Sequence, residues 1–133
     1  MAAGINILVN DGGAPARIIK VGNAAADINA GTMVGLTAAG LVVAENVALP
    51  ANSESIGVLF VDATSGDPAS VLTGSGIICF LGAASGAIAK GDPLSHDAAG
   101  LAKLAIVADD EVIAVALEAK GITHTGFVKA ILR

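Results

Sequence analysis

The stretch INAGTMVGLTAAGLVVA occupies residues 28–44, and a related stretch, IAKGDPLSHDAAGLAKL, occupies residues 88–104. Both begin with Ile, carry a Gly three positions later, and share the run Ala-Ala-Gly-Leu. A Gly after two small residues supplies the positive φ that a tight turn needs, and the apolar runs on either side are typical of short strands. Each stretch therefore predicts a β-hairpin, and the chain is predicted to contain one β-rich unit twice.

Two further blocks extend the repeat in the same order. The offset between the copies falls from 60 residues at the hairpin to 57 and then 50, which indicates shorter loops in the second copy. Two copies are too few for a solenoid, so the halves must pack on each other or close into a barrel. The matched blocks are 56–60 with 113–117 and 76–80 with 126–130, and the predicted repeat halves are 28–81 and 88–132.

About ten short strands separated by Gly-rich turns predict an all-β fold, a small β-sandwich or barrel. A length of 133 residues suits a single domain, which we place at residues 28–133. Residues 1–27 lie outside the repeat and contain two short apolar runs around a Gly- and Pro-containing turn. They predict an extended N-terminal arm; an ordinary first hairpin packed on the body is the alternative.

The composition favours a subunit of an assembly. Charged residues make up 14% of the chain, well below the roughly 25% of typical soluble domains, so much of the surface is expected to face neighbours. The net charge is −5, Trp and Tyr are absent, and no basic stripe occurs, so we expect no nucleic-acid partner. Residues 69–89 lack charge and are long enough to span a bilayer, but their many Gly and Ser residues argue against a membrane span.

Residues suited to chemistry are scattered, so we predict no cofactor, no metal site and no enzymatic activity. His96 lies beside Asp97 and near Asp92, which makes a weak divalent-ion site conceivable, but a solvated turn fits the same residues. His124 and the acidic run 109–111 are also interpreted as loop residues. Cys79 sits between apolar neighbours, where a thiol is inert. The lysine after the glycines of residues 82–91 lacks the spacing of a phosphate-binding loop.

The second copy carries a sequence resemblance. The segments AIAKGDPL (87–94), AAGL (98–101), IAVALEA (113–119) and VKAIL (128–132) resemble the capsid decoration, or cement, proteins of tailed phages. One departure is Ala114, where a Gly is common in that family, although the first copy has Gly57 at the matching place. The resemblance covers residues 28–133 and leaves the arm out.

The resemblance implies a virion protein that is made in the host cytoplasm and sits on the outer capsid surface, where it ties neighbouring capsomers together. Its implied partners are the major capsid protein and other copies of itself, as a homotrimer or a dimer. A tail or surface-layer component is the alternative assembly role. An extended arm can add a strand to an open sheet edge of the shell, so we expect deletion of residues 1–20 to abolish shell binding. The predicted capsid-contact residues are Ile5, Ile7, Val9, Arg17, Ile18 and Ile19.

Overall fold

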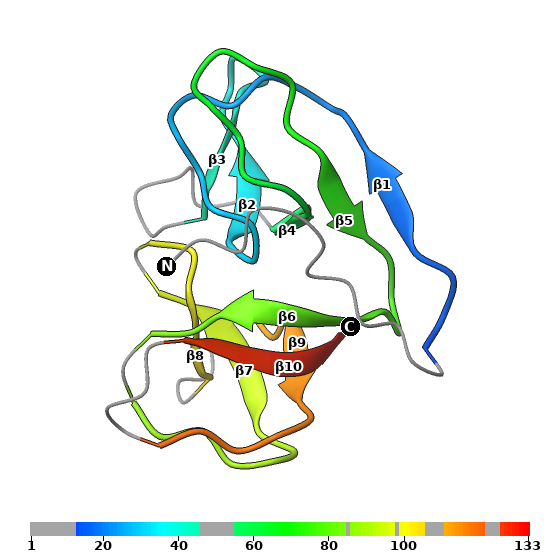
Figure 1. Cartoon of the computed structure of the whole chain (residues 1–133), viewed down its shortest axis with the longest axis vertical. Helices are drawn as coiled ribbons and strands as arrows, with labels where there is room; N and C mark the ends of the chain where they lie inside the picture. The colour runs from blue at the N-terminus through cyan, green and yellow to red at the C-terminus, as the bar shows by residue number, and fades with distance from the viewer. Residues whose placement is uncertain (1–12, 46–54, 85, 98, 106–110, 122–125) are drawn as a thin grey trace.

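The computed structural model describes residues 13–45, 55–84, 86–97, 99–105, 111–121 and 126–133. These residues form two five-stranded antiparallel sheets and no helix, which confirms the all-β prediction (Figure 1). The first sheet, in the upper part of Figure 1, has the order β1-β5-β4-β2-β3 and the second has the order β6-β10-β9-β7-β8. The strands are β1 (Arg17–Ile19), β2 (Met33–Leu36), β3 (Val42–Ala44), β4 (Gly57–Leu59), β5 (Val71–Thr73), β6 (Ile78–Gly82), β7 (Pro93–His96), β8 (Ala102–Leu104), β9 (Ala114–Ala116) and β10 (Phe127–Leu132).

The two sheets are copies of one arrangement, because adding five to each strand number of the first order gives the second. Hydrogen bonds outside the strands repeat as well. Ile28 exchanges two backbone hydrogen bonds with Ala63, and Ile88 exchanges the corresponding two with Lys120. Both predicted hairpins are present, as β2 with β3 and β7 with β8. The doubled unit inferred from the sequence is therefore a doubled structure.

The third matched block of the sequence repeat is wrong. The structure places β6 and β10 side by side in one sheet, with Cys79 opposite Ala130, whereas equivalent strands would occupy the same position in different sheets. In the strand order, β6 corresponds to β1 and β10 corresponds to β5. Short apolar strands that each follow a Gly resemble one another, and this resemblance produced the false match. The boundary between the sheets falls between Thr73 and Ile78, so β6 belongs with the second half instead of ending a first half at residue 81.

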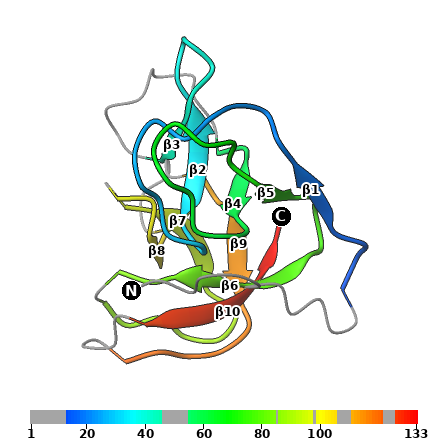
Figure 2. The same ribbon diagram turned by 45° about the horizontal axis from the view of Figure 1, so that its top comes forward.

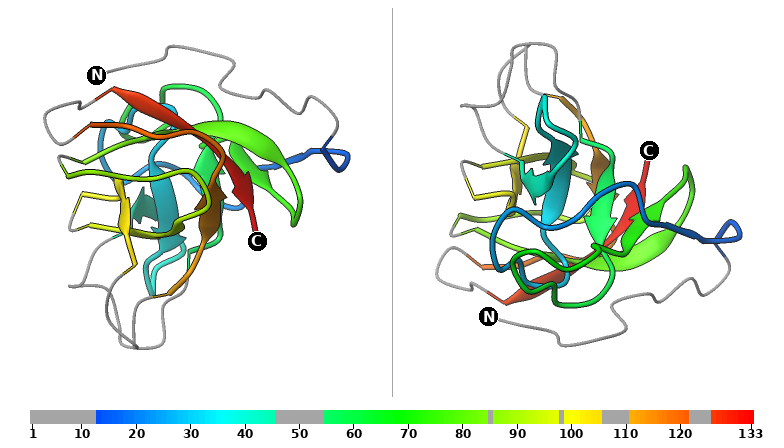
Figure 3. Two further views of the ribbon diagram at one scale, coloured as in Figure 1. Left: turned by 90° about the horizontal axis from the view of Figure 1, so that it is seen from below. Right: turned by 90° about the horizontal axis from the view of Figure 1, so that it is seen from above.

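The buried side chains form two clusters, one of which joins the halves. In the larger cluster, Met33, Val58 and Leu72 of the first sheet pack with second-half residues such as Leu81 and Leu132. The smaller cluster lies wholly within the first half, where Val34, Leu59 and Val71 pack beneath the segments around residues 24–28 and 63–69. Figures 2 and 3 show the same stacking of the two sheets from other directions.

One row of side chains behaves differently in the two halves. Strand register aligns Leu72, Val58 and Met33 across the first sheet, and all three are fully buried. The matching register aligns Ile131, Val115 and Pro93 across the second sheet. These residues belong to neither buried cluster; Pro93 is exposed and the other two are half-buried. We call the two sets the covered row and the open row.

The uncharged stretch 69–89 contains two short strands, β5 and β6. β5 lies between β1 and β4, and β6 lies at the end of the second sheet, beside β10. Within the residues described, no helix has the length and apolar character that crossing a membrane requires. The stretch is uncharged because its strands lie in the protein core: Leu72, Cys79 and Leu81 are fully buried.

Candidate functional site

Strand β1 forms an open edge of the first sheet. In the described part of the chain its strand partner is β5, and Figures 1, 2 and 3 all place it at the margin of the molecule. Arg17 is exposed and Ile18 is 48% exposed, the largest exposure of the large apolar side chains described. Ile19 turns inward and packs against the smaller cluster. Because side chains alternate along a strand, Arg17 and Ile19 share one face of β1, where Ile19 anchors it, and the other face presents the apolar side chain of Ile18.

The backbone of Ile18 faces the open side of this edge. The N–H of Phe60 donates to the carbonyl of Ser70 at 2.9 Å, so alternation makes Val58 and Leu72 a hydrogen-bonded pair between β4 and β5. The N–H and C=O of Leu72 therefore point toward β4, and its other neighbour, Ile18, is a non-hydrogen-bonded partner. The N–H and C=O of Ile18 consequently point outward, where an added strand would pair with them.

The structure brings part of the predicted contact set together. Arg17, Ile18 and Ile19 are consecutive on β1, at the edge just described. Ile5, Ile7 and Val9 lie outside the described residues. The sequence reasoning missed β5, the strand that holds β1 in the sheet, because Val71–Thr73 is short and is set in a long uncharged stretch.

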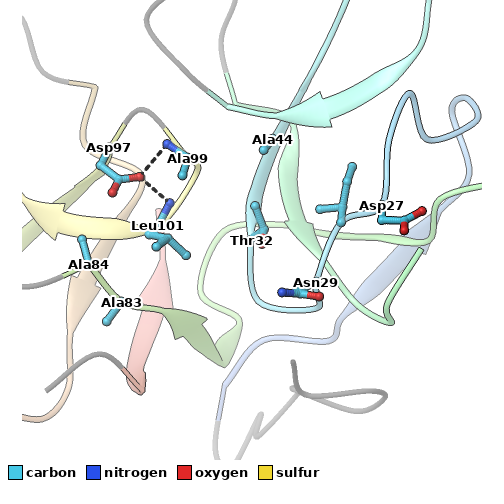
Figure 4. Close-up of a pocket in the computed structure, with 10 residues that line it drawn as sticks. Asp27, Asn29, Thr32, Ala44, Ala83, Ala84, Asp97, Ala99 and Leu101 are labelled. Carbon is cyan, nitrogen blue, oxygen red and sulfur yellow. Dashed lines mark hydrogen bonds between the residues drawn. The ribbon is translucent and has the colours of Figure 1, made fainter. Parts of the chain in front are cut away.

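A cleft lies between the two halves. The cleft has a volume of about 560 Å³, and in Figure 4 the second-half turn faces the first-half loop across it. The Asp97 carboxylate accepts the N–H groups of Ala99 and Leu101, at 2.8 and 2.9 Å, and Asp27 accepts the N–H of Ser65 at 2.9 Å. The Asp97 carboxylate therefore stabilises its own turn, and the Asp27 carboxylate joins its loop to the segment at Ser65. The lining residues are Asp27, Ile28, Asn29, Thr32 and Ala44 from the first half, and Ala83, Ala84, Asp97, Ala99 and Leu101 from the second.

The candidate metal-ligating residues make local contacts. Asp92 accepts the N–H of Ala89 at 2.8 Å, an Asp turn contact, and Nδ1 of His96 lies 3.0 Å from the carbonyl oxygen of Asp97. Among the described residues, no three His, Cys, Asp or Glu side chains gather in a group that could hold a metal ion. His124, Asp109 and Asp110 fall outside the described residues.

Cys79 is fully buried on β6, and desolvation by burial raises the pKa of its thiol to about 12. Since the thiolate is the reactive form, we expect Cys79 to resist a thiol reagent at pH 8 in the folded protein and to react quickly in denaturant. Time courses of thiol labelling with and without urea measure this. Rapid labelling of the folded protein would contradict the buried position of β6.

The raised pKa also fixes a pH dependence. Below about pH 9 the Cys79 thiol is protonated in both the folded and the unfolded chain. Between about pH 9 and 12 the unfolded chain loses this proton and the folded chain keeps it. Cys79 therefore lowers the free energy of unfolding as the pH rises through that range. Cys79→Ala is expected to flatten the loss of stability across this range relative to the unsubstituted protein, as urea titrations at several pH values would show.

The described residues thus form a small all-β body of two sheets, with β1 at an exposed edge. A family model described as phage cement protein matches residues 13–131, and the chain belongs to this family. The match confirms the resemblance seen in the second copy, and because the family is structural, it confirms that the protein is not an enzyme. Membership implies a location on the phage capsid. Among proteins of curated function, none has a sequence that matches this chain.

Proposed function

We propose that the protein binds the outer surface of the phage head, contacts the major capsid protein through the β1 edge, and stabilises the contacts between capsomers as a homotrimer. Membership of the cement family is the observation that carries the capsid role. The open edge supports the contact, since an added strand gains main-chain hydrogen bonds along its length and the exposed Ile18 adds apolar area. Arg17 adds a cationic group beside it.

The decisive experiment mixes the purified protein with undecorated heads and measures the protein that sediments with them. Heads carrying the protein are expected to release their DNA at a higher temperature than bare heads. The proposal fails if the protein stays in the supernatant or if it binds isolated tails in preference to heads.

Ile18→Pro tests the edge itself. Proline removes the outward N–H of Ile18 and is tolerated on edge strands whose N–H faces solvent, so the fold is expected to persist. We expect head binding to weaken at least about tenfold, which corresponds to roughly the 1.4 kcal/mol of one net hydrogen bond. Ile18→Val is the matched control, since it keeps the N–H and β-branching and should bind like the unsubstituted protein.

Deletion of residues 1–12 separates the arm from the edge. This truncation leaves all ten described strands in place, whereas the deletion of residues 1–20 also removes β1 and uncovers β5. If the arm carries the contact, the shorter deletion alone abolishes head binding. If β1 carries it, the shorter deletion retains binding that Ile18→Pro then weakens. Full binding by both variants would place the capsid contact elsewhere.

A further inference from the structure

The contact between the halves is one-sided. Met33 of the first half donates its N–H to the carbonyl of Gly100 in the second half at 2.8 Å, and Gly31 accepts the N–H of Gly82 at 2.9 Å. We call residues 31–33 with the covered row (Met33, Val58 and Leu72) the socket, and the turn at residues 97–101, which contains Gly100, the plug. The socket belongs to the first half and the plug to the second.

Because the halves repeat, the second half carries a socket of its own. Its backbone is Gly91, Asp92 and Pro93, and its side chains are the open row, Pro93, Val115 and Ile131. Gly31 and Met33 are buried, whereas the equivalent Gly91 and Pro93 are exposed. One oxygen of the Asp92 carboxylate accepts the N–H of Ala89, and the side chains of the open row beside it are apolar.

The first half likewise carries an unused plug. Its turn spans residues 37–41 and closes with the same hydrogen bonds as the turn at residues 97–101: Thr37 N–H to Leu41 C=O, and Asp97 N–H to Leu101 C=O. Gly100 is buried by the socket, but Gly40 is exposed and Leu41 is 39% exposed. Val21 is 45% exposed, while Leu81, at the matching register position of the second half, is fully buried. The side chains that would complete a second contact are therefore the exposed ones.

We propose that the plug at residues 37–41 of one copy docks in the second-half socket of another copy, so that the contact inside the chain is repeated between chains. A contact of two different surfaces joins copies head to tail and closes into a ring when the rotation permits. A ring of three copies joined by this contact would be the homotrimer proposed above, so the inference rests on that part of the proposed function. Pro93 has no N–H, so the bond from Met33 to Gly100 has no counterpart between chains, and apolar burial carries the contact.

Two surface substitutions test the contact in solution, without capsids. Leu41→Asp places a charge on the free plug, and Ile131→Lys places one on the open row, where neighbouring Lys129 shows that β10 accommodates a lysine. By analytical ultracentrifugation we expect the unsubstituted protein to self-associate and each variant to sediment as a monomer, with self-association at least about tenfold weaker. Leu41→Met and Ile131→Val are matched controls and should associate normally.

Mixing the two variants gives the sharpest result. Leu41→Asp retains an intact socket and Ile131→Lys retains an intact plug, so an equimolar mixture is expected to form a one-to-one dimer that cannot grow. Circular dichroism establishes that both variants are folded. The inference is overturned if the unsubstituted protein is a monomer, if either variant alone associates normally, or if the mixture of folded variants stays monomeric. Because no heads are present, a failure here is distinct from a failure of capsid binding.

Discussion

Leu72→Ala is expected to lower the free energy of unfolding by about 2–5 kcal/mol, the range for truncating a fully buried leucine. Leu72 is inaccessible to solvent and lies in the cluster that joins the two sheets. Its removal leaves a cavity at the junction of the halves, which the surrounding structure fills only in part. Domains of this size have about 5–15 kcal/mol of stability in total, so a loss near the top of the range would leave the protein partly unfolded.

Ile131→Ala is the matched control for this prediction. Ile131 holds the equivalent position in the open row, but it is only half-buried and belongs to neither cluster. We expect Ile131→Ala to lower the free energy of unfolding by about 1–2 kcal/mol, since part of the Ile131 side chain is already in water. Urea denaturation of dilute protein measures both values without a contribution from self-association. Equal costs for the two substitutions would contradict the one-sided contact between the halves.

The hairpins were predictable because a local signal specifies each of them. The Ala-Ala-Gly-Leu run fixes a turn, and Gly40 and Gly100 have the positive φ, 81° and 74°, that such a turn demands. β10 follows a regular alternation, with Val128, Ala130 and Leu132 buried and the residues between them half-buried. Local turn chemistry and a period of two therefore sufficed for these elements.

The pairing of strands was not predictable in the same way. β5 follows no alternation that distinguishes it, and its place in the sheet depends on pairing with β4 and also with β1, whose residues lie more than fifty positions away. The false match of β6 with β10 has the same cause: equivalence in a repeat is a matter of position in a sheet, and two similar apolar strands can be neighbours instead of equivalents. Sequence similarity alone does not separate these cases.

The candidate site was likewise predictable only in part. The sequence identified Arg17, Ile18 and Ile19 as a contact segment from their residue types, but the outward direction of the Ile18 backbone follows only from the register of β1, β5 and β4. The exposure of the open row could not be predicted from the sequence, because Val115 and Ile131 are residue types that usually lie in a core. Their exposure follows from which half covers which, and that is a property of the packed molecule.

Gly100→Ala is expected to destabilise the protein more than the same change at Gly40 by about 1–3 kcal/mol, the usual cost of overpacking. Both residues have positive φ, so the backbone strain of an alanine, roughly 1–2 kcal/mol, is common to the two variants and cancels in the comparison. A Cβ at Gly100 would lie 2.6 Å from the Met33 carbonyl oxygen and 2.7 Å from Cγ2 of Thr32, whereas a Cβ at Gly40 meets nothing within 4 Å. The difference therefore reports the plug in its socket.

Thermal and urea unfolding of the two dilute variants measure this difference, and identical stabilities would mean that Gly100 does not hold the halves together. The same pair also separates the two uses of the repeated turn. Gly100 lies inside the chain, so its substitution acts on folding and is independent of protein concentration. Gly40 lies in the exposed turn, so beyond the backbone strain that both variants share, its added methyl group should act when copies associate, and this part of its effect should grow with concentration. One substitution, made in each copy of a repeated unit, thus distinguishes the contact that folds the chain from the contact that joins chains.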